Sequence, residues 1–86
     1  MDYLITTPAQ LGMALKIARK QKKLTQAAAG AKVGLLPKTI SALEHNPEAC
    51  SIMSLIKLLS ALDLELSLAD KAVHRQSPEG GSGEGW

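Results

Sequence analysis

Apolar residues recur at helical spacing in two stretches of this chain. The first stripe consists of Leu11, Ala14, Leu15 and Ala18, and the second of Ile52, Leu55, Leu58, Leu59 and Leu62. Steps of three and four residues place such side chains on one face of an α-helix. The pattern therefore predicts one helix over residues 8–21 and a second, very apolar helix that would form the centre of the core.

Local start signals agree with both helices. Thr7 and Gln10 match a capping box, in which each side chain can satisfy a free backbone N–H of the other residue. Pro8 suits the first helical position, where its missing N–H has no consequence. Ser51 is a favourable N-cap for the second helix.

Two shorter helices are predicted between them. Thr25 can cap a helix over residues 26–32, and Pro37 can open another over residues 37–44. The connection at residues 33–36 contains Gly34, which permits a tight turn. Two short helices joined in this way have the outline of a helix-turn-helix.

The first of these short helices consists almost entirely of small residues. Gly30 lowers helix propensity by roughly 1 kcal/mol relative to alanine. We interpret it in two ways, which can both hold: another backbone, that of the following helix, passes close to Gly30, or the helix is weakly specified and stabilised only by its neighbours.

Residues 64–68 change the pattern from helical spacing to strict alternation of leucine with polar residues. Such alternation predicts a half-buried strand, whose backbone groups need a partner. The partner is either residues 3–5 of the same chain or the same strand of a second copy across a two-fold axis. We favour the second arrangement, in which Leu64, Leu66 and Leu68 contribute to dimerisation.

The two ends differ from this helical domain, which covers residues 8–70. Residues 1–7 form a short N-terminal segment, and within it residues 2–6 could be a strand or an arm. Residues 71–86 have the composition of a flexible tail. The tail ends in Trp86, which is either a free end or a hydrophobic anchor for another protein.

Composition limits the class of protein. With 86 residues, two aromatic residues and one cysteine, the chain fits a single small all-α domain without an intramolecular disulfide. We find no signal peptide, membrane span, metal-ligand spacing or catalytic motif, and expect a cytoplasmic protein that is not an enzyme and has no cofactor, metal or small-molecule substrate.

Positive charge is concentrated in the first half of the chain. Of the ten basic residues, seven lie between the acids Asp2 and Glu44: Lys16, Arg19, Lys20, Lys22, Lys23, Lys32 and Lys38. A positive end of this kind favours a polyanion, although such residues can also be merely solvated. The overlap with the helix-turn-helix favours DNA.

The chain resembles the Xre and lambda-repressor-like helix-turn-helix family, and within it the HipB antitoxins that pair with HipA-type kinase toxins. The resemblance covers about residues 8–70. It rests on Arg19, Thr25-Gln26, Val33-Gly34, Thr39-Ile40-Ser41, Glu44, Asn46-Pro47 and the run from Leu62 to Leu68. It implies a compact fold of four to five helices with a C-terminal strand, and the tail ending in Trp86 is similar to HipB in particular.

The resemblance implies roles for single residues. The expected DNA-contacting residues are Gln26 at a phosphate, Thr39 near the backbone, and Pro37, Lys38, Ser41 and Ala42 toward base edges. Lys38 is suited to guanine and Ala42 to a thymine methyl group. Arg19 and Glu44 would form an internal salt bridge.

This sequence departs from the family pattern at two places. Ala29 stands where leucine is usual, and Leu36-Pro37 replaces polar residues at the start of the recognition helix.

Our hypothesis is a dimeric antitoxin and autorepressor that binds a palindromic operator in double-stranded DNA and a HipA-like toxin kinase, the latter through Trp86. The alternatives are a stand-alone repressor and a protein-interaction module that does not bind DNA.

Overall fold

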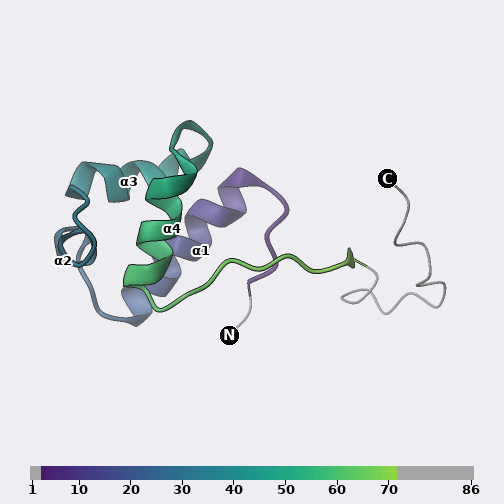
Figure 1. Ribbon diagram of the computed structural model, residues 1–86, viewed down its shortest axis with the longest axis horizontal. Coiled ribbons are helices and arrows are strands. Elements are labelled where there is room, and N and C mark those ends of the chain that lie inside the picture. The colour runs from purple at the N-terminus through teal and green to yellow at the C-terminus, as the bar shows by residue number, and fades with distance from the viewer. Residues whose placement is uncertain (1–2, 72–86) are drawn as a thin grey trace.

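The computed structural model describes residues 3–71, and these form a small bundle of helices (Figure 1). The elements are α1 (Pro8–Gln21), α2 (Gln26–Ala31), α3 (Pro37–His45), the 3-10 helix η1 (Pro47–Ala49) and α4 (Ile52–Ala61). The four predicted α-helices and the helix-turn-helix arrangement are confirmed. The connection between α3 and α4 contains the short helix η1.

Side chains cap three of the four α-helices. The Thr7 hydroxyl accepts from the amide of Gln10 at 3.2 Å, while the Gln10 side-chain oxygen accepts from the amide of Thr7, also at 3.2 Å. At α2 and α4 the hydroxyls of Thr25 and Ser51 accept from the amides of Ala28 and Ser54, at 3.0 and 3.1 Å. These bonds satisfy backbone groups that have no partner inside a helix, and they explain why the sequence predicted the helix starts well.

α1 and α4 end in the same geometry. Lys23 and Asp63 adopt left-handed backbone conformations, with φ of 59° and 58°. The amides of the next residues, Leu24 and Leu64, then donate to carbonyls five positions back, at 3.2 and 2.8 Å. This is the Schellman arrangement, and both leucines pack against the core.

The core lies between α1, α3 and α4. Its largest fully buried side chains are Leu15, Ile40, Leu43, Leu58 and Leu62. Both predicted stripes contribute, but the assignment of Ile52 to the buried stripe was wrong because its side chain is 67% exposed. As the first residue of α4, Ile52 lies at the end of the helix, whereas Leu55 and Leu58 lie further along it and are buried in the core.

Glycines permit two close approaches of backbone. A Cβ on Gly30 would overlap the carbonyl oxygen of Leu35, so the backbone close to α2 is that of the turn before α3 and not that of α3 itself. A Cβ on Gly12 in α1 would overlap the carbonyl oxygen of Glu44 in α3. Gly34 has a φ of 74°, a conformation that side chains disfavour, and it permits the turn between α2 and α3.

Residues 64–70 run as an extended segment away from the helices, without strand pairing within the described chain (Figure 1). No backbone hydrogen bond joins residues 64–68 to residues 3–5, so the intrachain pairing that we considered is not formed. Leu64 is half-buried, whereas Leu66 and Leu68 are 56% and 96% exposed. Within residues 3–71, residues 64–68 therefore have no strand partner.

The described part of the N-terminal segment is an arm that lies on α1. Residues 3–6 have no strand assignment, and the Tyr3 side chain packs against the core. Its hydroxyl donates to Gln21 at 3.4 Å, at the far end of α1. Trp86 and the tail beyond residue 71 lie outside the described residues.

Candidate nucleic-acid interface

α2 and α3 form a unit in which α3 presents one face outward (Figure 1). Ala29 and Ile40 are fully buried, and Gly30 brings α2 against the turn that precedes α3. Small side chains in α2 thus let the two helices pack closely. The alanine at position 29, where the family usually has leucine, fills a fully buried site in this arrangement.

The outward face of α3 carries most of the residues that we predicted to contact DNA. Pro37, Lys38 and Ala42 are exposed, and Thr39 and Ser41 are half-buried. Lys38, Ser41 and Ala42 lie at helical spacing and share one face. The structure thus groups these five residues on one helix of the helix-turn-helix.

Gln26, the remaining predicted DNA-contacting residue, lies on α2 and is hydrogen-bonded to α3. It is half-buried at the start of α2, and its amide nitrogen donates to Glu44 at 3.3 Å. A glutamine amide has two N–H donors, so one of them stays available for another acceptor. Gln26 is therefore positioned by the same carboxylate that binds Arg19.

Arg19 and Glu44 form a bidentate ion pair between α1 and α3. The Arg19 Nε and Nη2 atoms donate to the two Glu44 carboxylate oxygens at 2.6 and 3.2 Å, and Nη1 donates to the carbonyl of Leu24 at 2.8 Å. The two side chains are 9% and 0% exposed. The pair joins α1, the start of α2 and α3, and it neutralises the acidic group nearest the recognition face.

Sequence reasoning assigned no role to His45, which the structure places on the same face of α3. His45 is exposed, and it follows Ser41 by one helical turn. Its Nδ1 lies 2.8 Å from the Ser41 carbonyl oxygen and 3.4 Å from the Ser41 hydroxyl. The spacing of positions 38, 41, 42 and 45 could have identified it from the sequence.

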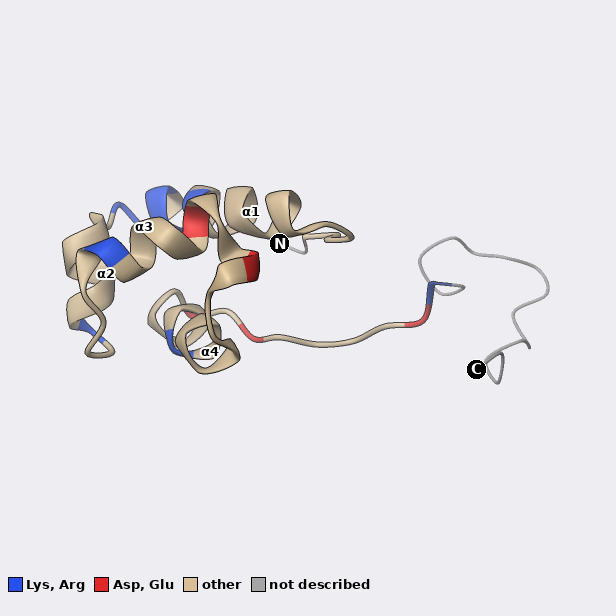
Figure 2. Cartoon of the chain, turned by 90° about the horizontal axis from the view of Figure 1, so that it is seen from above, with Lys and Arg blue, Asp and Glu red and all other residues tan. Residues whose placement is uncertain are grey.

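Lys and Arg residues occur at several positions along the helical part of the chain (Figure 2), and most of those that precede Glu44 are exposed. The exposed basic residues are Lys20 in α1, Lys22 and Lys23 in the turn that follows, Lys32 at the end of α2, and Lys38 in α3. Lys16 in α1 is half-buried. Within residues 3–43 the sequence has no acidic residue. The part of the surface next to α2 and α3 is therefore positive, as DNA binding requires.

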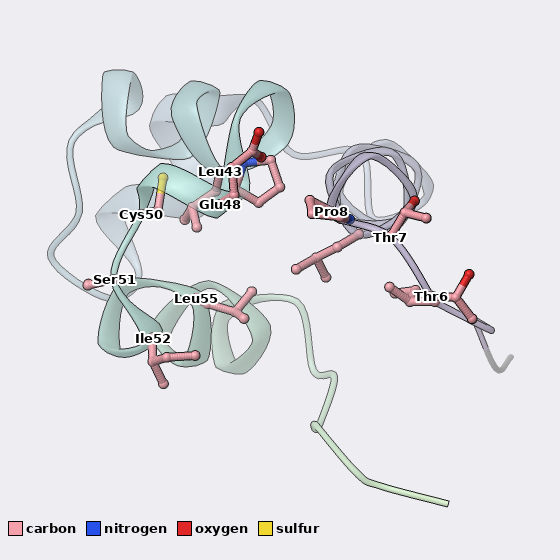
Figure 3. Close-up of a pocket in the computed structure, with 12 residues that line it drawn as sticks. Thr6, Thr7, Pro8, Leu43, Glu48, Cys50, Ser51, Ile52 and Leu55 are labelled. Atoms are coloured by element: carbon pink, nitrogen blue, oxygen red, sulfur yellow. The ribbon is translucent and has the colours of Figure 1, made fainter. Parts of the chain in front are cut away.

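A pocket of about 430 Å³ lies between the starts of α1 and α4 (Figure 3). It is lined largely by apolar side chains, including Leu11, Leu43 and Leu55, and its ionisable residues are Glu48 and Cys50. No group of three or more potential metal ligands occurs within residues 3–71. In the same part of the chain, no helix is both long and apolar enough to cross a membrane.

Comparison with known proteins agrees with this geometry. A family described as Helix-turn-helix matches residues 15–68. The chain is 37% identical over 75 residues to Antitoxin HipB of Escherichia coli strain CFT073, which covers 87% of this chain and 78% of that protein. The chain belongs to the HipB antitoxins of the helix-turn-helix family. Antitoxin HipB of Escherichia coli K12 is 36% identical over 75 residues, with 87% of this chain and 83% of that protein covered.

Solved structures of HipB superpose on the described fold. A HipB variant in complex with an O2 20mer gives a TM-score of 0.78 at 35% identity, covering 83% of this chain and 99% of that one. HipB from a HipA-HipB-O2-O3 complex gives a TM-score of 0.76 at 35% identity, covering 79% and 96%. The predicted family is therefore confirmed: the chain belongs to the HipB-type antitoxins and shares their helix-turn-helix fold.

Proposed function

We propose that this HipB-type chain is a dimeric antitoxin that represses its own promoter through a palindromic DNA operator and binds a HipA-like kinase toxin. The observation that carries the proposal is its 35% identity and TM-score of 0.76 to the HipB of a HipA-HipB-O2-O3 complex. The exposed face of α3 and the positive surface around it supply the chemistry that such a DNA complex needs.

In this proposal α3 enters the major groove with its N-terminal end. Lys38 donates to the O6 and N7 acceptors of a guanine, and Ala42 contacts a thymine methyl group. Ser41 can donate to or accept from a base edge. Thr39 and Pro37 lie at the margin of the groove, where they contact the DNA backbone and the first base edge.

One N–H of the Gln26 side-chain amide donates to Glu44, and the other donates to a DNA phosphate. The hydrogen bond of 3.3 Å to Glu44 orients the side chain before DNA arrives. Because Glu44 is held by Arg19, the Arg19–Glu44 pair positions both Gln26 and α3. Its role is therefore structural, and neither member reads a base.

The dimer forms through residues 64–68 of two copies, paired as antiparallel strands across a two-fold axis. The exposure of Leu66 and Leu68 supports this arrangement, as does an extended backbone that is unpaired among the described residues. A symmetric dimer presents two α3 helices to two half-sites about 34 Å apart, one helical turn of DNA. The operator is palindromic for the same reason.

The toxin-binding element is the tail, with Trp86 as its anchor. Tryptophan is enriched among residues that dominate the binding energy of interfaces. This assignment rests on the sequence, since the tail lies beyond the described residues. It separates toxin binding at the end of the chain from DNA binding at α3.

One observation favours a protein-interaction module that does not bind DNA. Leu36 is 60% exposed and precedes Pro37, so the first turn of the recognition helix has few hydrogen-bond donors. A conventional repressor would place polar side chains there. Measuring DNA binding directly therefore decides between the two functions.

The test uses the full chain and a duplex from the promoter of its own gene, in a fluorescence anisotropy titration at several salt concentrations. We expect specific binding that weakens steeply with salt. A kinase-like reading frame beside the gene, expressed together with the chain, should copurify with it. Equal binding to the promoter and to an unrelated duplex would contradict the repressor function.

A further inference from the structure

His45 is the last residue of α3, and a hydrogen bond within the helix fixes the orientation of its imidazole ring. The Nδ1 atom of His45 lies 2.8 Å from the carbonyl oxygen of Ser41, and a carbonyl can only accept a hydrogen bond. Nδ1 therefore carries a proton in both the neutral and the charged ring. Nε2 is the atom that gains the additional proton, and within residues 3–71 it has no hydrogen-bond partner.

His45 lies at the end of the face that is proposed to read DNA. It follows Lys38 by seven positions, Ser41 by four and Ala42 by three, all of which are helical spacings. When the N-terminal end of a recognition helix contacts base edges, the C-terminal end of the same face approaches the edge of the groove. The groups at that edge are phosphates.

The charges around His45 leave a cationic ring without an anion. Glu44, the adjacent acid on α3, is 0% exposed in its side chain and is bound by Arg19. The other charged groups on the elements packed against α3 are Glu48 on η1, Lys16, Arg19 and Lys20 on α1, and Lys57 on α4. His45 forms no ion pair within the described residues, and the C-terminus of a helix favours a positive charge.

We propose that His45 binds an operator phosphate as an imidazolium, with Nδ1 on the Ser41 carbonyl and Nε2 on a phosphate oxygen. The inference rests on the proposed DNA-binding function. Each His45 then takes up a proton when the operator binds. Histidine changes charge between about pH 5 and 8, so the affinity for DNA rises as the pH falls through this interval.

The experiment measures operator affinity from pH 8 to pH 6 at constant ionic strength, using anisotropy with the promoter duplex. An exposed ion pair contributes roughly a three-fold gain for each histidine, so we expect a dimer to bind about ten-fold more tightly at pH 6. His45→Asn should abolish most of this dependence, and His45→Lys should bind tightly at both pH values. His74→Asn is a matched control, because the chain has two histidines, and it should keep the dependence of the wild type.

The salt dependence separates a phosphate contact from an indirect effect through helix stability. A direct contact makes the slope of log affinity against log salt steeper by about 0.9 for each charged His45 at pH 6. A ring that only stabilises α3 changes the affinity and leaves the slope unchanged. An unchanged slope, or a pH dependence that persists in His45→Asn, overturns the inference. Absence of specific DNA binding at every pH overturns the proposed function and the inference together.

Discussion

Gly12 of α1 lies so close to the backbone of Glu44 in α3 that a Cβ on Gly12 would overlap the Glu44 carbonyl oxygen. The Glu44 side chain is held at the same time by Arg19, which lies two turns further along α1. One residue of α3 is thus fixed through both its backbone and its carboxylate. This double contact sets the orientation of the helix that carries the recognition face.

Gly12→Ala tests the close approach. At an open helical site this change would raise stability by up to about 1 kcal/mol, because alanine is the better helix former. Here the new methyl group meets backbone, which cannot swing aside, and overpacking of this kind costs about 1 to 3 kcal/mol. We expect a lower free energy of unfolding by urea denaturation. Ala9→Gly, at an exposed site of α1, reports the propensity effect alone, and a stabilised Gly12→Ala protein would contradict the packing.

Arg19→Met tests the buried ion pair. It leaves the Glu44 carboxylate, with a side chain 0% exposed, without its cation, and loss of one partner of a buried pair typically costs about 3 to 5 kcal/mol. Replacing both Arg19 and Glu44 with methionine should be less destabilising than Arg19→Met alone, because no buried charge remains unpaired.

Lys22 provides a matched control for that comparison. Its amino group lies 3.4 Å from the Asp63 carboxylate, and the two side chains are 43% and 84% exposed. An exposed pair contributes about 0 to 1 kcal/mol, so Lys22→Met should hardly change the free energy of unfolding. Equal losses for Lys22→Met and Arg19→Met would contradict the distinction between the two pairs.

The helices were predictable because their signals are local. Thr7, Thr25 and Ser51 cap helices through residues three positions away, and Pro37 opens α3, so short stretches of sequence contain the whole cause. The predicted DNA-contacting residues of α3 came instead from the resemblance to the family, and helical spacing is consistent with them. Given a helix over residues 37–45, spacing alone groups Lys38 with Ser41 and Ala42.

Contacts between distant segments were harder to predict. Nothing near Gly12 in the sequence indicates that the carbonyl of Glu44 will pack on it. The expectation that Gly30 lies against the backbone of α3 was wrong at short range, because the backbone that lies close is that of Leu35 in the preceding turn. Helical spacing alone placed Ile52 in the core, although it lies at the end of α4. The alternation in residues 64–68 predicts a strand but says nothing about where its hydrogen-bond partner comes from.

Lys38→Ala tests the base-reading face. Loss of a contact to a guanine edge should weaken binding at a cognate operator by about 1 to 3 kcal/mol and relax the preference at that base pair. Lys57→Ala removes the same charge from an exposed site on α4, outside the helix-turn-helix, and should have a much smaller effect. Competition titrations with single-base operator variants measure both quantities. A uniform loss across all sequences would make Lys38 a phosphate contact instead.

Leu66→Lys together with Leu68→Lys tests the proposed dimer strand. Both side chains are more than half exposed in the single chain, so the charges should not disturb the helical fold. In a paired strand they would place like charges close together across the two-fold axis, which is destabilising. We expect monomers by sedimentation equilibrium, with unchanged helical circular dichroism and weaker operator binding. Leu4→Lys, at a residue that is 70% exposed on the N-terminal arm, should remain dimeric.

Trp86→Ala and a truncation before Ser77 test whether the tail binds the toxin. A tryptophan that anchors an interface contributes about 2 kcal/mol or more, so either change should weaken binding to the copurified kinase by roughly 30-fold. Operator affinity should stay close to that of the full chain, because α3 and residues 64–68 are intact. Measuring both affinities on the same preparations separates a lost anchor from a misfolded protein. Equal toxin affinity with and without Trp86 would contradict the anchor role, and toxin binding would then be assigned to the folded domain.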